Sequence, residues 1–254
     1  MKCMIVIPAR LASTRLSEKL LLRAEGKSIL QHTYEAALKS TLADDVLVAV
    51  DDPRLAHEVD SFGGQARLTS VDCQSGTDRI AEVALLHDDV DIFLNLQGDE
   101  PEISPSTLDA VVGLLASQPE ADMATAITPI RDLQQLQDPA CVKVVVGQGR
   151  AITFSRAAVP HARDGDAEVW LMSEPSVYFQ HLGVYAYRRS FLEWFCTQPP
   201  SILEQIEKLE QLRAIEAGKT VVVAEVAEAT PGIDTLEDYR AFQERLAGAS
   251  QRDV

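Results

Sequence analysis

The hydrophobic pattern in the first half of the chain alternates short apolar runs with amphipathic segments. The continuous apolar runs predict buried strands over residues 3–7, 45–50 and 91–96. The segments between and after these runs have helical spacing and predict helices over residues 28–40, 53–62, 77–87 and 104–117. Ser28 and Thr77 stand where N-caps are expected, and Gly63-Gly64 ends the second helix. Alternation of this kind is typical of a mostly parallel sheet with helices on both faces.

The pattern changes from about residue 122, where β-rich runs follow one another closely. These runs predict antiparallel strands over residues 122–130, 141–147, 151–155 and 177–189. Residues 157–176 contain Pro, Gly and charged side chains without a period, so we expect a mobile loop there. Two helices, a strand and a last helix are predicted near residues 191–197, 203–217, 220–225 and 235–247. We therefore expect an α/β core of residues 1–121 and 218–254, with a β-rich insertion over residues 122–217.

Composition narrows the class of protein. The 254 residues include 23 basic and 39 acidic side chains, a net charge of −16, which argues against nucleic acid as a partner. No apolar stretch is long enough for a membrane span, and the first apolar run stops at Pro8 and Arg10, unlike a signal peptide. The four cysteines are widely spaced and form no CxxC pair, which favours reduced thiols. We expect a cytoplasmic protein that does not bind membranes.

The loop after the first strand is rich in hydrogen-bond donors. It contains Arg10, Ser13, Arg15 and Lys19, in a chain that is otherwise acidic. Ligands of parallel α/β sheets bind beyond the carboxyl ends of the strands, so this loop is placed to bind a polyphosphate. The alternative is a solvated surface loop whose cations offset nearby acids. The loop is not one of two familiar nucleotide motifs: "EGKS" lacks the first glycine of a P-loop, because position 21 is Leu21, and no GxGxxG follows the strand.

Two acidic turns complete the candidate chemistry. "LQGDEP" follows the third strand of the first half and contains Asp99, and "GIDTLED" follows the last strand and contains Asp234. A carboxylate that faces phosphate oxygens requires a cation between them, and Mg²⁺ prefers oxygen ligands of this kind. The alternatives are an Asp that builds a turn and an Asp that caps a helix.

These stretches together resemble the 3-deoxy-manno-octulosonate (Kdo) cytidylyltransferases. The resemblance covers nearly the whole chain, in the order "VIPARLASTRLSEK", "QSGTDR", "LQGDEP", "FSRAAVP", "HLGVYAYR", "LEQLR" and "GIDTLED". It implies a Rossmann-like α/β nucleotidyltransferase fold, with a mixed, mostly parallel sheet and an antiparallel β insertion for sugar binding and homodimer contact. It also implies a Mg²⁺-dependent reaction of CTP with Kdo, which gives CMP-Kdo and pyrophosphate for lipopolysaccharide biosynthesis in the cytoplasm.

The resemblance also implies roles for individual residues. The triphosphate would be held by Arg10, Ser13, Arg15 and Lys19. The cytidine pocket would be lined by Gln74, Ser75, Gly76 and Arg79. The sugar acid would be contacted by Gln97, Arg163, His181, Tyr185, Glu210 and Gln211. Mg²⁺ would be bound by Asp99 and Asp234. The catalytic residues would be Arg15, Lys19 and Asp99.

The chain departs from the family pattern at three places. Ser17 and Glu18 replace Pro and Gly in the first loop, Cys73 replaces a His before "QSGT", and His161-Ala162 replaces Trp-Asp. The last change leaves open a related substrate, such as an amino-substituted analogue of Kdo. Glu18 leaves open a catalytically silent scaffold, although the chain retains the lysine and both aspartates. On strand pattern alone, His181 could equally be a core histidine.

Overall fold

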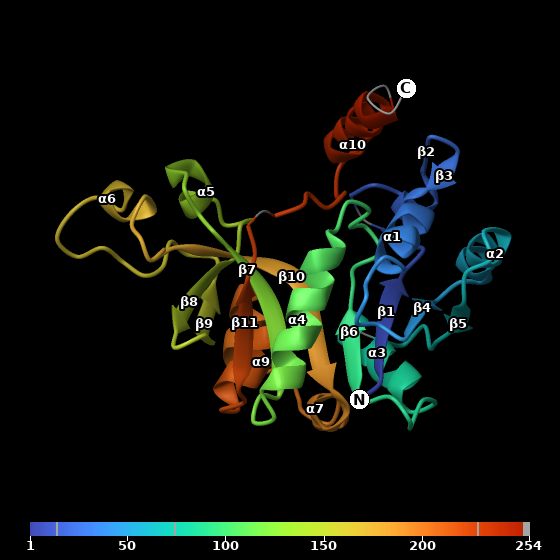
Figure 1. The fold of residues 1–254 in the computed structure, drawn as a ribbon, viewed down its shortest axis with the longest axis horizontal. Helices are drawn as coiled ribbons and strands as arrows, with labels where there is room; N and C mark the ends of the chain where they lie inside the picture. The colour runs from blue at the N-terminus through green and yellow to red at the C-terminus, as the bar shows by residue number, and fades with distance from the viewer. Residues whose placement is uncertain (14, 74, 228, 251–254) are drawn as a thin grey trace. The chain divides into compact units, whose positions relative to one another are not determined.

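The computed structural model describes residues 1–13, 15–73, 75–227 and 229–250 of the chain (Figure 1). It contains two compact units. The first unit comprises Met1–Asp109 with Thr230–Val254, and the second comprises Ala110–Ala229. The division falls within helix α4 (Pro105–Ser117). Each unit has strands and helices of its own, so the two are described in turn.

The first unit is built on parallel strands. β1 (Cys3–Ala9), β4 (Asp45–Val50), β5 (Ala66–Leu68) and β6 (Ile92–Asn95) lie in the order β5-β4-β1-β6. The pairings β1–β4, β1–β6 and β4–β5 are all parallel. All seven residues of β1 are buried, because β1 lies inside the sheet and helices cover it. The parallel sheet predicted from the apolar runs is confirmed.

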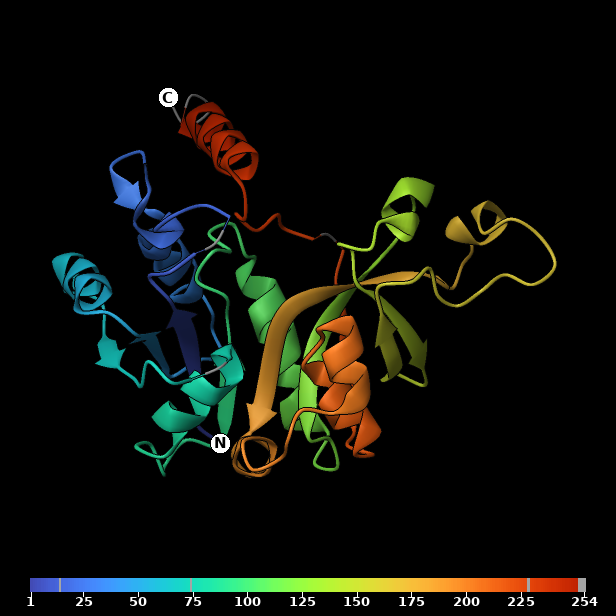
Figure 2. The same cartoon turned by 180° about the vertical axis from the view of Figure 1, so that it is seen from behind.

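The helices of the first unit cover both faces of these strands. α1 (Ile29–Ala37) lies in front of them in Figure 1, and α3 (Gly76–Ala84) lies in front in Figure 2. The first unit also contains α2 (Pro53–Ser61) and α10 (Leu236–Ser250). Ser28 caps α1 as predicted, since its side chain accepts a hydrogen bond from the amide of Gln31. The predicted cap of α3 was wrong, because Ser75, two residues before Thr77, is the N-cap and forms a reciprocal capping box with Asp78.

The β2–β3 hairpin accounts for the "EGKS" sequence. β2 (Arg23–Ala24) and β3 (Lys27–Ser28) are antiparallel, and Gly26 at the turn has a φ of 79°. A residue without Cβ adopts this left-handed conformation without steric cost. The turn predicted at Gly26 is therefore confirmed, whereas the short strands on either side gave no periodic signal.

The second unit is mainly antiparallel. Its strands are β7 (Met123–Pro129), β8 (Lys143–Gly147), β9 (Arg150–Ser155), β10 (Phe179–Arg188) and β11 (Val221–Glu225). They lie in the order β10-β7-β11-β9-β8, with a further pairing of β10 with β8. The β10–β7, β8–β9 and β11–β9 pairs are antiparallel, whereas β11 runs parallel to β7. The predicted change to antiparallel strands after residue 122 is confirmed.

The helices of the second unit are short. They are α5 (Leu133–Gln137), α6 (Glu168–Leu171), α7 (Arg189–Phe195), α8 (Ile202–Glu207) and α9 (Gln211–Glu216). The single helix predicted over residues 203–217 was wrong, because Lys208 at the end of α8 has a φ of 55°. A left-handed residue ends the helical hydrogen-bond ladder, and the apolar period continues across the break.

Residues 156–178 extend away from β8 and β9 and carry α6, as Figures 1 and 2 both show. Arg131, which follows β7, fastens the end of this segment. Its Nη1 donates to the carbonyl oxygens of Leu171 and Ser173 over 2.8 and 3.0 Å, and its Nη2 donates to Ser176 Oγ over 2.8 Å. The sequence gave no signal for this arginine, because its partners lie about forty residues further along the chain.

Candidate functional site

The loop after β1 brings its cations to the carboxyl end of the parallel strands. Lys19 opens the short 3₁₀ helix η1 (Lys19–Leu21). Buried Leu20 packs below it, with its side chain 3.3 Å from the Cβ position that a larger residue would occupy at Gly98. The carbonyl oxygen of Pro8 lies 3.4 Å from the same point. Glycine at position 98 thus lets the turn after β6 approach both β1 and η1.

The turn after β6 positions Asp99. Thr33 of α1 donates from its hydroxyl to the carbonyl oxygen of Gly98 over 2.9 Å, and Ile233 donates from its amide to the carbonyl oxygen of Asp99 over 2.8 Å. The first bond fixes the turn to α1. The second joins it to the C-terminal segment that carries Asp234.

The C-terminal segment is itself ordered by a carboxylate. Asp238 Oδ2, in the first turn of α10, accepts the amides of Asp234 and Thr235 over 3.1 and 2.8 Å. Carboxylates stabilise helix N-termini because free amides and the helix dipole lie there. Asp234 is thereby held at the start of α10, where the sequence placed it as a possible cap or ligand.

Lys19, Asp99 and Asp234 converge on one point. The Lys19 ammonium donates to Asp99 Oδ2 and, over 2.8 Å, to Asp234 Oδ1. Arg15 Nη1 lies 3.1 Å from the other oxygen of Asp234. Burial lowers the pKa of Lys19, but attraction and hydrogen bonds from the two carboxylates outweigh this effect and leave the pKa above its ordinary value. The two carboxylates, from positions 99 and 234, thus lie on one cation, the Lys19 ammonium.

Glu100, directly after Asp99, is mainly protonated at pH 7 and adds little negative charge there. Burial, together with the neighbouring Asp99 carboxylate, raises the pKa of Glu100 to about 8. Gly232 packs against it, since a Cβ at position 232 would lie 3.7 Å from Glu100 Cγ. Sequence reasoning passed over Glu100, although its place directly after Asp99 was a signal that could have found it.

Glu18 is turned toward another arginine. Its backbone has a φ of 48°, the left-handed conformation for which the glycine of the family pattern is suited. Its carboxylate pairs with Arg54 at the start of α2, at a distance of 2.8 Å from Oε1 to Nη1. The acid in the loop after β1 is thus paired with Arg54, and this contact weakens the single observation that favoured a silent scaffold.

The residues expected around the cytidine differ in exposure. Gln74 lies outside the described residues. Ser75 uses its hydroxyl to cap α3, and a Cβ at Gly76 would lie 3.2 Å from the Pro8 side chain. The Arg79 side chain is 0% exposed and donates to Thr69 Oγ1 and to the carbonyl oxygen of Ser70. Arg10 is exposed, and its Nη2 donates to the carbonyl oxygen of Cys73 over 2.9 Å. Ser13 is half-buried in the same loop.

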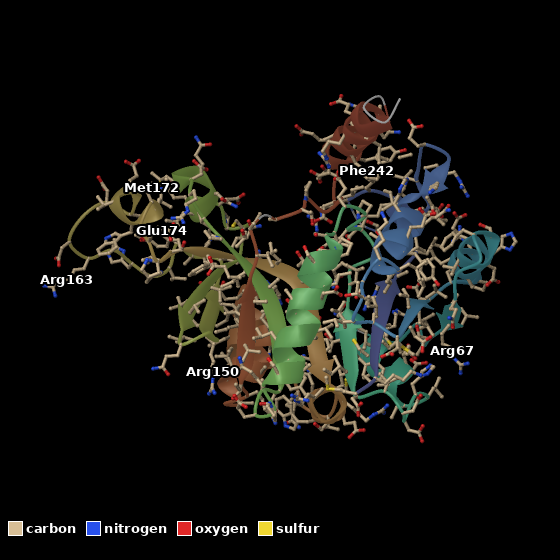
Figure 3. All side chains as sticks on the ribbon, in the orientation of Figure 1. Arg67, Arg150, Arg163, Met172, Glu174 and Phe242 are labelled. Carbon is tan, nitrogen blue, oxygen red and sulfur yellow. The ribbon has the colours of Figure 1, made fainter. Side chains whose placement is uncertain are left out.

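The residues expected around the sugar come from both units. Gln97, in the first unit, is half-buried and donates to Asn95 Oδ1 over 3.3 Å. The other five belong to the second unit. Arg163 lies at the far end of the 156–178 segment, where its side chain points outward (Figure 3). It is 90% exposed and pairs with the neighbouring Asp164.

His181 is one of the two buried residues among these five, with Gln211. It lies on β10, shares a hydrogen bond of 2.9 Å with Thr125 Oγ1, and has its ring edge against Phe154. Tyr185 lies 5.2 Å from it, centroid to centroid. Burial lowers the pKa of His181 to about 3, so its imidazole is neutral at pH 7. Both the ligand and the core interpretation of His181 remain compatible with this position.

Glu210 and Gln211 stand at the start of α9. Glu210 is half-buried and Gln211 is buried. The buried Nε2 of Gln211 has no hydrogen-bond partner among the residues that the structure describes. Leaving a buried amide donor without a partner is costly. The lack of a partner is expected for a group that forms its hydrogen bond with a ligand.

The described part of the chain has no helix that is long and apolar enough to span a membrane. Nor do three or more His, Cys, Asp or Glu side chains gather there as a complete metal site.

Comparison with known proteins places this arrangement in a class. The family model described as cytidylyltransferase matches residues 4–221. A relative from Rhodopirellula baltica, named 3-deoxy-manno-octulosonate cytidylyltransferase, is 72% identical over 97% of this chain and 99% of its own length. One of the same name from Pseudomonas fluorescens is 48% identical over 95% of this chain and 97% of its own. The chain belongs to the cytidylyltransferase family, and within it to the 3-deoxy-manno-octulosonate cytidylyltransferases.

A solved structure supports the fold. The structure of CMP:2-keto-3-deoxy-manno-octonic acid synthetase complexed with CTP matches with a TM-score of 0.90 and 40% identity. The match covers 98% of this chain and 100% of that one. The mixed α/β nucleotidyltransferase fold predicted from the sequence is confirmed.

Proposed function

We propose that the protein transfers CMP from CTP to Kdo, yielding CMP-Kdo and pyrophosphate for lipopolysaccharide biosynthesis. The observation that carries this function is the 72% identity over 97% of the chain to a 3-deoxy-manno-octulosonate cytidylyltransferase. It favours Kdo over an amino-substituted analogue. The convergence of Lys19, Asp99 and Asp234 argues against a silent scaffold, because such a protein has no need of a charged centre.

The nucleotide half of the site is proposed to lie at the loop after β1. Arg10, Ser13, Arg15 and Lys19 would bind the triphosphate. Ser75, Gly76 and Arg79, with Gln74 from outside the described residues, would surround the cytidine. The exposure of Arg10 and Arg15 supports this assignment. Arg15 is more than half exposed, and its guanidinium can move from Asp234 to a phosphate.

The chemistry requires little covalent work from the protein. The anomeric hydroxyl of the sugar attacks the α-phosphorus of CTP, the bond to the bridging oxygen breaks, and pyrophosphate leaves. Negative charge grows on the leaving group, and Lys19 and Arg15 are proposed to stabilise it. Positioning and charge stabilisation of this kind account for most of the rate enhancement in phosphoryl transfer.

We propose that Asp99 and Asp234 bind Mg²⁺ when CTP is present. The support is that both carboxylates reach one cation, the Lys19 ammonium, so a single ion is within range of the pair. Two carboxylates with phosphate oxygens and water are the ligands Mg²⁺ prefers. The ion would supply charge neutralisation between carboxylates and phosphates. Lys19 would then be released toward the phosphates.

The sugar half is proposed to comprise Gln97 with residues of the second unit, namely Arg163, His181, Tyr185, Glu210 and Gln211. The buried, unpartnered Nε2 of Gln211, within the described part of the chain, supports a ligand there. The neutral imidazole of His181 can donate or accept a hydrogen bond with a hydroxyl. Arg163 is proposed to pair with the sugar carboxylate, for which its exposed, weakly held guanidinium is available.

The setting of the enzyme also stays a proposal. We propose a cytoplasmic homodimer in which the β-rich insertion makes the contact, without nucleic acid or membrane partners. The net charge of −16 supports the absence of nucleic acid, since a phosphate backbone would be repelled.

The experiment that tests the function follows pyrophosphate release. The protein is incubated with CTP, Mg²⁺ and each of several 3-deoxy sugar acids, including Kdo and its 8-amino analogue. We expect release with Kdo and CTP and its loss when Mg²⁺ is chelated. Release with the amino analogue alone would overturn the substrate, and no release with any sugar would favour the scaffold.

A further inference from the structure

A fully buried arginine in the first unit has an unusual position. Arg79 of α3 is 0% exposed, and its Nε and Nη2 have no hydrogen-bond partner within the part of the chain that the structure describes. Its Nη2 lies 3.7 Å from Asp51 Oδ2, so this carboxylate balances the buried charge. Burying an arginine is expensive unless an acid lies beside it, so the position of Arg79 depends on the Asp51 carboxylate.

Asp51 has a second partner, which lies in the first loop. Its Oδ1 accepts the amide of Leu11 over 3.0 Å. Asp51 follows β4 and Leu11 follows β1, and the two strands end side by side, with Ala9 paired to Val50. The carboxylate thus bridges the ends of two neighbouring strands, with Arg79 on one oxygen and the loop backbone on the other.

Leu11 lies between Arg10 and Ser13, which are proposed to bind the triphosphate. Its own side chain is buried and anchors the loop, while the bond from its amide fixes the direction in which the chain leaves β1. The donors of the loop can meet a phosphate without reordering only if this direction is set in advance. Preorganised donors bind more tightly because less conformational entropy is lost on binding.

The same face of α3 holds the next segment. Glu82, one turn after Arg79, accepts the amide of Ser70 over 2.9 Å and lies 3.4 Å from the Cys73 thiol. The carbonyl oxygen of Cys73 in turn accepts from Arg10 Nη2. α3 therefore holds both residues 69–73 and Asp51. Cys73 bonds to Arg10 and Asp51 bonds to Leu11, so both contacts reach the loop proposed to bind the triphosphate.

We propose that Asp51 and Arg79 are positioning residues for CTP, acting through the backbone of Leu11. This inference rests on the proposed function, and it concerns the nucleotide half of the site. Asp51 contacts no phosphate; it determines the conformation in which Arg10 and Ser13 are presented. The pocket-lining role implied for Arg79 by the family stays a prediction, and the positioning role is independent of it.

The chain offers a matched control. Asp44 Oδ2 accepts the amide of Cys3 over 2.8 Å, at the opposite end of β1. Asp44 and Asp51 therefore flank β4 and make the same kind of bond, Asp44 to the first residue of β1 and Asp51 to the loop that follows β1 beside the proposed site. Asp44→Asn and Asp51→Asn both remove a charge and retain the shape of the side chain.

The test measures CTP binding by calorimetry in the presence of Mg²⁺, with the KM values for CTP and Kdo and the unfolding temperature. We expect Asp51→Asn to raise the Kd for CTP about tenfold, with the KM for Kdo unchanged. Asp44→Asn should bind CTP like the wild type. Equal CTP affinity in the two variants, or a parallel loss for CTP and Kdo, would overturn the inference.

A double variant covers the case in which Asp51→Asn folds poorly. Asp51→Asn with Arg79→Met removes the buried charge together with its partner, and inorganic tripolyphosphate is the probe because it does not reach the cytidine pocket proposed for Arg79. We expect the unfolding temperature to recover while tripolyphosphate binding stays weak. Recovery of both would show a purely structural role and would contradict the proposal. Wild-type protein that binds CTP but releases no pyrophosphate would contradict the proposed function instead, since the affinity comparison does not depend on turnover.

Discussion

At the scale of single residues, the charged centre depends on three side chains that the sequence keeps far apart. Asp99 and Asp234 are separated by most of the chain, and Lys19 joins them. The motifs that contain these residues identified each one, but not the contact. Thr125, Arg54 and Arg131 were missed, because each acts on a partner distant in sequence and none belongs to a patterned motif.

Replacement of Asp99 tests the metal proposal. We expect Asp99→Asn to lower kcat by about a thousandfold, because the charge that balances the cation is lost while the side-chain shape is kept. Glu102→Gln is the control, since Glu102 lies three residues further on and pairs with Arg245 of α10. Pyrophosphate release is the measurement. Similar rates for Asp99→Asn and the control would remove Asp99 from the metal site.

The burial of His181 predicts a pH dependence of stability. Its pKa is about 3 in the folded protein, against 6.5 for an unperturbed histidine, so protonation favours the unfolded chain. The stability is fully present above pH 6.5 and is lost as the pH falls toward 3. Wild-type protein should lose about 2 kcal/mol more than His181→Gln between pH 7.5 and pH 5, as measured by urea unfolding.

A control separates this effect from the titration of other groups. His57→Gln removes a histidine at the surface of α2, and its stability should follow that of the wild type over the same pH range. Identical pH dependence in wild type and His181→Gln would mean that the imidazole is solvated, contrary to its buried position.

At the scale of elements, the parallel half of the chain was the easier half to predict. Continuous apolar runs mark strands that are covered on both faces, and β1, β4 and β6 all correspond to such runs. The predictions were wrong where a capping hydrogen bond or a left-handed residue set the bounds of a helix against the hydrophobic pattern. Ser75 displaced Thr77 as the cap of α3, and Lys208 divided a predicted helix into α8 and α9.

Lys208 provides a test of that division. A glycine at a left-handed position removes the steric cost of Cβ, so Lys208→Gly should raise the free energy of unfolding by about 0.5–1 kcal/mol. In a continuous helix the same change would lower it by about 1 kcal/mol. Chemical denaturation therefore gives opposite signs for the two structures. Gln205→Gly, inside α8, is the control and should destabilise.

At the scale of the whole molecule, the family match and the comparison of folds agree on a nucleotidyltransferase. The acidic composition makes the basic first loop distinctive, because its cations gather in a chain with a net charge of −16 and are the basis of the proposed triphosphate site. The match of 98% of the chain to a solved CTP complex shows that this fold extends over nearly all residues.

Assembly is the prediction that belongs to this scale. We expect sedimentation equilibrium to give about twice the mass of one chain at micromolar concentration, because the β-rich insertion is proposed to join two copies. Several apolar side chains of the second unit are exposed, among them Ile152, Val169 and Met172. A single-chain mass over the whole concentration range would exclude the homodimer.

The sequence by itself determined the parallel strands, the loop chemistry and the family, since all three are written in contiguous residues: apolar runs, a cationic loop and ordered motifs. Tertiary structure alone decided that Lys19 bridges Asp99 and Asp234, that Arg54 neutralises Glu18, and that Arg79 is buried against Asp51. The physical reason is that electrostatic and hydrogen-bond partners are chosen by distance in space. Whether a residue is buried, and which charged group lies beside it, is decided only when folding brings separate segments of the chain together.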